Sequence, residues 1–151
     1  MHKINGTYCA ALTPLNSDYT INQEMFLDHC NYLLSQGIDG LGVFGTTGEA
    51  NSFSVKEKIE AIHYIINNSI DVDKIIPGTG LCSVSETVMF SKEVASLKVK
   101  AVLVLPTFYY NNVSNMIANR FVTDDDDVIV YQYHNYKDVN LYGLNVSLFL
   151  L

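Results

Sequence analysis

The feature that most limits the possible folds is an alternation of short apolar runs with longer segments of helical periodicity. The apolar runs carry no polar face, which is typical of strands buried on both sides in a parallel sheet. We predict strands at 6–12, 40–44, 74–77, 100–105 and 128–131, and helices at 22–36, 54–68 and 83–97. This order predicts serial βαβ units. Before the fifth strand, residues 113–122 leave room only for a short, poorly patterned helix.

Two of the predicted helices begin with the pattern of a capping box. Ser54-Val-Lys-Glu57 and Ser83-Val-Ser-Glu86 each place a hydroxyl at the N-cap and a glutamate three residues later. In this motif the hydroxyl accepts from the third helical N–H, and the glutamate accepts from the N-cap N–H. We therefore expect both helices to begin at these serines with reciprocal bonds.

Composition excludes several classes of protein. The 151 residues are 48% hydrophobic and 17% charged, with a formal net charge of -7, which predicts one acidic globular domain. Eight lysines and the single arginine Arg120 are too few and too scattered for nucleic-acid binding. The aspartates at 124–127 are typical of a solvated turn, and we predict no metal site. Cys9, Cys30 and Cys82 form no CxxC pair, which favours reduced thiols and a cytoplasmic location. No apolar run is long enough to predict a membrane span.

Small and polar residues gather just after the predicted strands. They occupy 13–14, 45–49, 78–80 and 106–110. A doubly wound sheet and a (β/α)₈ barrel, which has eight strands, both place ligand sites at this carboxyl edge. The periodicity alone leaves the choice between these two architectures open.

The turn Gly45-Thr-Thr-Gly-Glu49 offers backbone N–H groups and two hydroxyls that suit a carboxylate or a phosphate. It lacks the lysine of a P-loop, and Gly78-Thr-Gly80 lacks the third glycine of a dinucleotide fingerprint, so nucleotide binding is disfavoured. The alternative for both segments is a tight turn between strand and helix with no ligand. Tyr109, Tyr110 and Tyr131 follow or end strands at the same edge, although such tyrosines often serve only in a core or an interface.

Five of these motifs, in this order and spacing, resemble the dihydrodipicolinate synthase and N-acetylneuraminate lyase family. The resemblance covers residues 4 to about 114 and is carried by GTYCAALTP at 6–14, GIDG at 37–40, GTTGE at 45–49, PGTG at 77–80 and AVLVLPTFYY at 101–110. It implies a (β/α)₈ barrel in which pyruvate, or a 2-oxo acid that releases it, forms a Schiff base with a lysine. We expect a small-molecule substrate of this kind and no cofactor.

The resemblance also implies roles for individual residues. Thr47 matches the position that holds the pyruvate carboxylate, with Gly45 as a second substrate-binding residue, and Thr46 matches a hydroxyl of a proton relay. Tyr109 matches a relay tyrosine that reaches a neighbouring subunit, which implies a homo-oligomer. Tyr131 matches the tyrosine that shuttles a proton during imine formation and carbon–carbon bond making or breaking.

The sequence departs from the family after residue 115. Gln132, Tyr133 and His134 replace the residues that follow the signature tyrosine, and Tyr136 stands where the synthase branch has an arginine. This disfavours lysine-pathway synthase activity and favours the branch that acts on sugar-derived 2-oxo acids.

The family's Schiff-base lysine is expected on a sixth strand, after Leu151. Lys137 falls in the loop after the fifth strand, and we expect it at the surface. We therefore interpret residues 1–151 as the N-terminal portion of one barrel domain, truncated before the lysine and inactive alone. The alternative is a truncated or decayed homologue that acts as a non-catalytic binding or oligomerisation partner, or has no function. A self-sufficient five-stranded doubly wound binding domain is a third possibility.

Overall fold

A computed structural model describes residues 4–105 and 130–132. Its strands are β1 (Tyr8–Ala10), β2 (Gly40–Val43), β3 (Ile75–Pro77), β4 (Val102–Val104) and β5 (Val130–Gln132). Its α-helices are α1 (Gln23–Ser35), α2 (Val55–Asn67) and α3 (Val84–Ser96), with short 3₁₀ turns η1 (Ala50–Ser52) and η2 (Val72–Lys74). The predicted alternation of strands and helices is confirmed, although β1 is shorter than expected and the 3₁₀ turns were not predicted. The helix considered at 113–122 lies outside the described residues.

The strands form two parallel groups. The first has the order β1-β2-β3, and the second pairs β4 with β5. In the first group Leu41 stands beside Cys9 on one side and Ile75 on the other. An isolated parallel bridge between Gly78 and Leu103 links the end of β3 to β4. All strand pairs of the described residues run parallel, as the serial βαβ pattern predicts.

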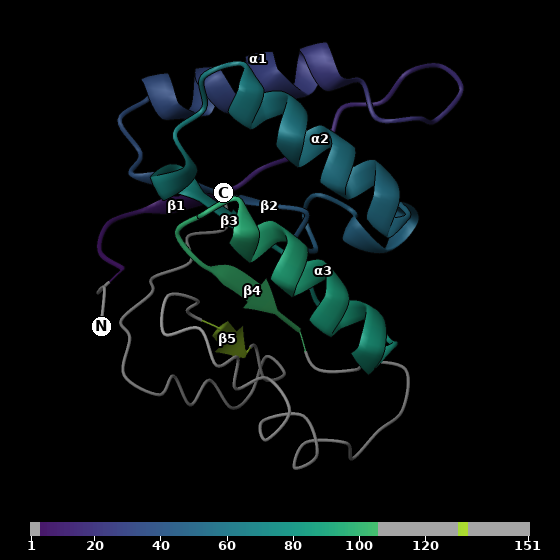
Figure 1. Cartoon of the computed structure of the whole chain (residues 1–151). Helices are drawn as coiled ribbons and strands as arrows, with labels where there is room; N and C mark the ends of the chain where they lie inside the picture. The colour runs from purple at the N-terminus through teal and green to yellow at the C-terminus, as the bar shows by residue number, and fades with distance from the viewer. Residues whose placement is uncertain (1–3, 106–129, 133–151) are drawn as a thin grey trace.

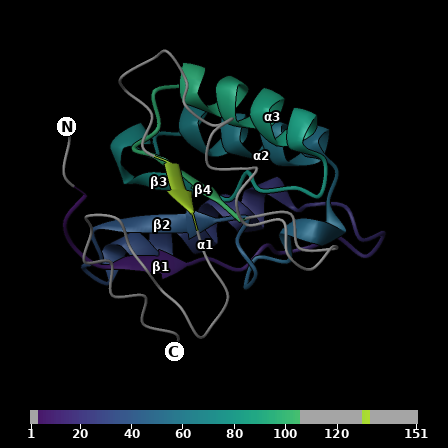
Figure 2. The same ribbon diagram turned by 90° about the horizontal axis from the view of Figure 1, so that it is seen from below.

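The three helices lie on one face of the strands (Figures 1 and 2). The core between them includes Phe26 of α1, Ile62 of α2 and Phe90 of α3, all without solvent exposure. These side chains pack against alternate strand residues, namely Leu41, Val43, Ile75, Val102 and Val104. A second cluster contains Tyr8 and Ile76 at intervening strand positions together with Ile4 and Ala101, and Leu103 of β4 packs against it. Apolar residues on both faces explain why the strands read as continuous apolar runs.

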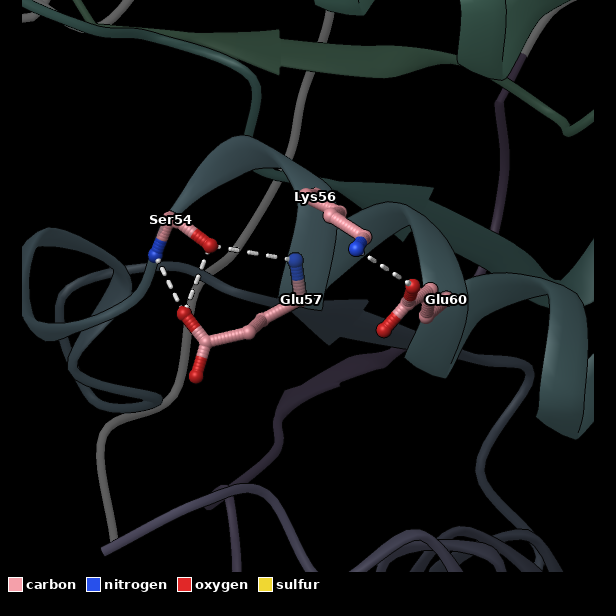
Figure 3. Close-up of polar contacts among 4 residues, drawn as sticks. All are labelled: Ser54, Lys56, Glu57 and Glu60. Atoms are coloured by element: carbon pink, nitrogen blue, oxygen red, sulfur yellow. Dashed lines mark hydrogen bonds and ion pairs between the residues drawn. The ribbon is translucent and has the colours of Figure 1, made fainter.

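Helix α2 begins with the predicted capping box, drawn in Figure 3. The Glu57 N–H donates to Ser54 Oγ over 3.2 Å, and the Ser54 N–H donates to Glu57 Oε2 over 2.8 Å. Ser54 Oγ also donates to the same carboxylate oxygen over 2.6 Å, and these bonds lower the pKa of Glu57. The first turn of α2 is therefore held from both sides.

The prediction of a second reciprocal box at α3 is wrong in one half. The Glu86 N–H donates to Ser83 Oγ over 3.3 Å, but the Ser83 N–H does not donate to the Glu86 carboxylate in return. The Ser83 hydroxyl lies 3.0 Å from the hydroxyl of Ser85 instead. The position equivalent to Ser85 in α2 is Lys56, which has no hydroxyl, and there the Ser54 hydroxyl donates to the Glu57 carboxylate.

Within the described ranges, no helix combines the length and the apolar character that a membrane crossing requires.

Candidate functional site

The turn that follows β2 leaves the sheet at its carboxyl edge and is bracketed by two residues with left-handed backbone angles. Phe44 has φ 54° and Glu49 has φ 52°. For a bulky side chain such as that of Phe44 this conformation is rare and costs free energy. Inside the turn, the Glu49 N–H donates to the Thr46 carbonyl over 3.1 Å, and the Ala50 N–H donates to the Gly45 carbonyl over 3.2 Å. The turn is thus tightly wound between two strained residues.

The side chain of Phe44 anchors the start of this turn in the core. Its ring is 1% exposed, and its centroid lies 5.4 Å from that of Phe26 and 6.4 Å from that of Phe53. Burial of an aromatic ring among other rings is strongly favourable. This burial offsets the backbone strain and keeps the turn in one place.

The end of β1 holds the other side of the turn. Thr13 Oγ1 donates to the Gly48 carbonyl over 2.8 Å. A Cβ added at Gly48 would stand 2.9 Å from the Ala11 carbonyl oxygen, so the two backbones are in close contact there. Thr13 and Gly48 were both predicted at the carboxyl edge, and the structure brings them together.

The end of β3 packs directly under the turn. The Gly78 N–H donates to the Val43 carbonyl over 2.7 Å, and a Cβ at Gly78 would collide with the Phe44 carbonyl. A Cβ at Gly80 would collide with the backbone of Leu105. Between them Thr79 is fully buried, with its hydroxyl 2.8 Å from Ser91 Oγ. Residues 78–80 were expected to form either a ligand site or a tight turn without a ligand. The structure supports the tight turn, because the two glycines pack against backbone and the Thr79 hydroxyl pairs with Ser91.

The residues predicted to act on substrate are placed as follows. Thr46 is exposed, while Gly45 and Thr47 are half-buried, and all three lie immediately after β2. Among the described residues, neither the N–H groups nor the hydroxyls of Thr46 and Thr47 donate to a protein acceptor. Tyr131 lies in β5, with its backbone paired with Leu103. Tyr109 lies outside the described residues.

One buried polar residue beside the turn was missed. Lys58 of α2 has no solvent exposure, and its Nζ donates to the Ala50 carbonyl over 3.2 Å. Nζ also stands 5.2 Å from the centroid of the Phe90 ring. Burial lowers the pKa of Lys58, with Glu57 and Glu86 opposing that shift. A signal was present, since Lys58 shares the helical spacing of the buried residues Ala61, Ile62 and Ile65.

The buried Cys30 thiol of α1 is unsuited to nucleophilic chemistry. Burial raises the pKa of the Cys30 thiol to about 12, so it is not a thiolate at neutral pH. In the described ranges no group of three or more histidine, cysteine, aspartate or glutamate side chains could hold a metal ion. The N–H and O–H donors of the Gly45–Glu49 turn have the chemistry that suits a small anion.

Comparison with known proteins places this arrangement in a family. A model described as the dihydrodipicolinate synthetase family matches residues 3–143. The 4-hydroxy-tetrahydrodipicolinate synthase of Shewanella piezotolerans is 34% identical over 111 residues, which cover 74% of this chain and 38% of that protein.

Two solved structures give the same result. Dihydrodipicolinate synthase from Agrobacterium tumefaciens is 27% identical, with a TM-score of 0.74, and the match covers 83% of this chain and 47% of that one. N-acetylneuraminate lyase from Proteus mirabilis is 29% identical, with a TM-score of 0.62 over 69% of this chain and 35% of that one. The chain spans less than half the length of each of these proteins. The match over residues 3–143, together with the shared parallel α/β arrangement, shows that the chain belongs to the dihydrodipicolinate synthetase family.

Proposed function

We propose that residues 1–151 form the first five strands of a (β/α)₈ lyase or aldolase domain. In this proposal the Gly45–Glu49 turn binds the carboxylate of pyruvate, or of a 2-oxo acid that releases pyruvate. The observation that carries the proposal is the strained turn at the carboxyl edge of the sheet, which Thr13 and the Phe44 ring hold in place. Within this turn, the hydroxyls and N–H groups of Thr46 and Thr47 donate to no acceptor among the described residues.

The geometry suits this task for a physical reason. Donors that are already fixed in place lose little entropy and need little reorganisation when they bind an anion. The Thr47 hydroxyl and N–H are proposed to hold the carboxylate, while the Thr46 hydroxyl joins a proton relay. Tyr131 and Tyr109 are proposed to complete that relay, Tyr109 from a neighbouring subunit of a homo-oligomer.

The Schiff base requires a lysine on a strand, and none of the strands among the described residues carries one. We expect that lysine on a sixth strand, supplied by further polypeptide, so residues 1–151 should bind pyruvate without converting it. The altered residues after Tyr131 favour a sugar-derived 2-oxo acid over the lysine-pathway substrate. The three cysteines without a CxxC pair fit a cytoplasmic setting.

The test is pyruvate binding to the 151-residue chain, measured by isothermal titration calorimetry or by NMR shift changes. Thr47→Val keeps the shape of the side chain and removes the hydroxyl. Loss of a hydrogen bond to a charged group costs about 1.5–3 kcal/mol, so the dissociation constant should rise about 10–100-fold. Thr7→Val is the matched control, because Thr7 is an exposed threonine just before β1, at the opposite edge of the sheet.

Two results would overturn the proposal. One is the absence of any pyruvate binding by the unaltered chain, and the other is equal weakening by Thr47→Val and Thr7→Val. Borohydride treatment in the presence of pyruvate adds an independent check. It should trap no adduct on residues 1–151, whereas a stable adduct on Lys137 would show that this chain carries its own Schiff-base lysine.

A further inference from the structure

We infer that Lys58 is a positioning residue for the Gly45–Glu49 turn, because its buried ammonium holds the Ala50 carbonyl directly after the turn. This inference rests on the proposed function of the turn as a carboxylate site. It assigns to α2, a helix that carries none of the predicted site residues, the task of fixing the backbone that presents Thr46 and Thr47.

The burial of Lys58 needs an explanation. Placing an ammonium group out of water is costly unless the group is paired or hydrogen-bonded. The side chain is fully buried, yet among the described residues no carboxylate lies within ion-pair distance of Nζ. Its described partners are the Ala50 carbonyl and the Phe90 ring. A methionine would fill similar space without the cost of burying a charge, so the hydrogen bond is the feature that distinguishes lysine at this position.

Ala50 is the residue through which Lys58 acts on the turn. The Ala50 N–H donates to the Gly45 carbonyl over 3.2 Å, and the Ala50 carbonyl accepts from Lys58 Nζ over the same distance. A single residue thus ties the first residue of the turn to helix α2. The helix is a firm base, because the Ser54 and Glu57 capping box fixes the turn of α2 that precedes Lys58.

The strain in the turn gives this tie its importance. Left-handed backbone angles at Phe44 and Glu49 cost free energy and persist only where surrounding contacts enforce them. Thr13 holds the Gly48 carbonyl from the side of β1, and Lys58 holds the Ala50 carbonyl from the side of α2. Without Lys58, residues 50–52 would keep only the hydrogen bonds within the Gly45–Glu49 turn and within η1.

The decisive experiment is hydrogen exchange of the complete chain, because it needs no substrate. In Lys58→Met we expect the hydrogen-bonded amides within residues 45–50, those of Glu49 and Ala50, to exchange at least about 10-fold faster than in the unaltered chain, with β3 amides unchanged. Lys56→Met is the matched control. Lys56 lies two residues away on the same helix, is 84% exposed, and points to Glu60 at 3.8 Å (Figure 3). We expect it to leave exchange at 45–50 unchanged.

A second variant separates positioning from simple stability. Lys58→Gln keeps an N–H donor but no charge, and it should slow exchange at 45–50 relative to Lys58→Met. Unchanged exchange at 45–50 in Lys58→Met would overturn the inference. An equal acceleration in β3 would also overturn it, because that would show general destabilisation.

Pyruvate affinity provides a further measurement. We expect Lys58→Met to weaken binding at least about 5-fold and Lys56→Met to leave it unchanged. If the unaltered chain binds no pyruvate, the proposed function fails, while faster exchange at 45–50 would still identify Lys58 as the residue that holds the turn. If pyruvate binds and neither exchange nor affinity responds to Lys58→Met, the inference fails and the proposed function stands.

Discussion

Gly78 is the position where the smallest substitution should have the clearest effect. A Cβ there would overlap the Phe44 carbonyl oxygen, and it would stand 2.8 Å from the Phe44 carbonyl carbon and 3.3 Å from the Gly45 nitrogen. These neighbours are backbone atoms that cannot swing away. Phe44 already has φ 54°, and its ring is locked in the core, so the strand end has little freedom to adjust.

The expected magnitude follows from these contacts. Overpacking of one methyl group costs about 1–3 kcal/mol, and contact with immobile backbone places Gly78→Ala at the upper end of that range. Alanine also lowers the conformational entropy of the unfolded chain, which stabilises the folded state by about 0.4–1 kcal/mol and partly offsets this cost. We therefore expect a net loss of about 2–2.5 kcal/mol in the free energy of unfolding. For a chain of this length the midpoint temperature should fall by roughly 4–10 °C.

Urea unfolding followed by circular dichroism measures this loss, provided that the slope with urea stays the same. Gly45→Ala is the control, because a Cβ there has no neighbour within 4 Å and the backbone angle is not left-handed. Gly45→Ala should keep the stability or raise it by up to about 1 kcal/mol. The reasoning is refuted if Gly78→Ala lies within about 0.5 kcal/mol of the unaltered chain or if the two variants are equally destabilised.

Three further predictions use the same unfolding assay. Ser54→Ala should lower the free energy of unfolding by about 1–2 kcal/mol and Ser83→Ala by about 0.5–1 kcal/mol, because only Ser54 has reciprocal capping bonds. A larger loss in Ser83→Ala than in Ser54→Ala would contradict this account. Thr13→Val should cost about 1 kcal/mol through loss of the bond to the Gly48 carbonyl, whereas an unchanged midpoint would show that this bond contributes nothing. Burial raises the pKa of the Cys30 thiol from 9.0 to about 12. The contribution of this protonated thiol to the free energy of unfolding is therefore complete below pH 9.0 and is lost as the pH rises towards 12, by up to about 4 kcal/mol. Cys30→Ala should flatten this alkaline decline, and an equally steep decline in that variant would assign it to other groups.

The order of strands and helices was predictable because it depends on local periodicity. Each predicted strand from 6–12 to 128–131 overlaps an observed strand, and the helices α1, α2 and α3 begin and end within one residue of the predicted bounds. The capping box at Ser54 depends on residues three positions apart, so it too was predictable. At Ser83 the same local pattern forms only half of the box: the Glu86 N–H donates to Ser83 Oγ, and the return bond is absent.

The candidate site was predictable in part. Parallel strands end at one edge, so the sequence placed Gly45, Thr46 and Thr47 correctly after β2. The close approach of Gly78 to Phe44 and the pairing of Thr79 with Ser91 could not be predicted, because they join segments that no sequence motif relates. The roles of Tyr109 and Tyr131 stay predictions from the family resemblance.

By itself, the sequence determined which segments become strands and helices, and that the polar turns gather at one edge of a parallel sheet. These properties follow from periodicity and from the geometry of βαβ connections, which need no knowledge of distant contacts. Only the tertiary structure decided that Phe44 and Glu49 take left-handed angles and that Lys58 is buried against Phe90. Such features arise where helices and strand ends from different units meet, and there the packing of neighbours overrides the preference of each residue for water or for ordinary backbone angles.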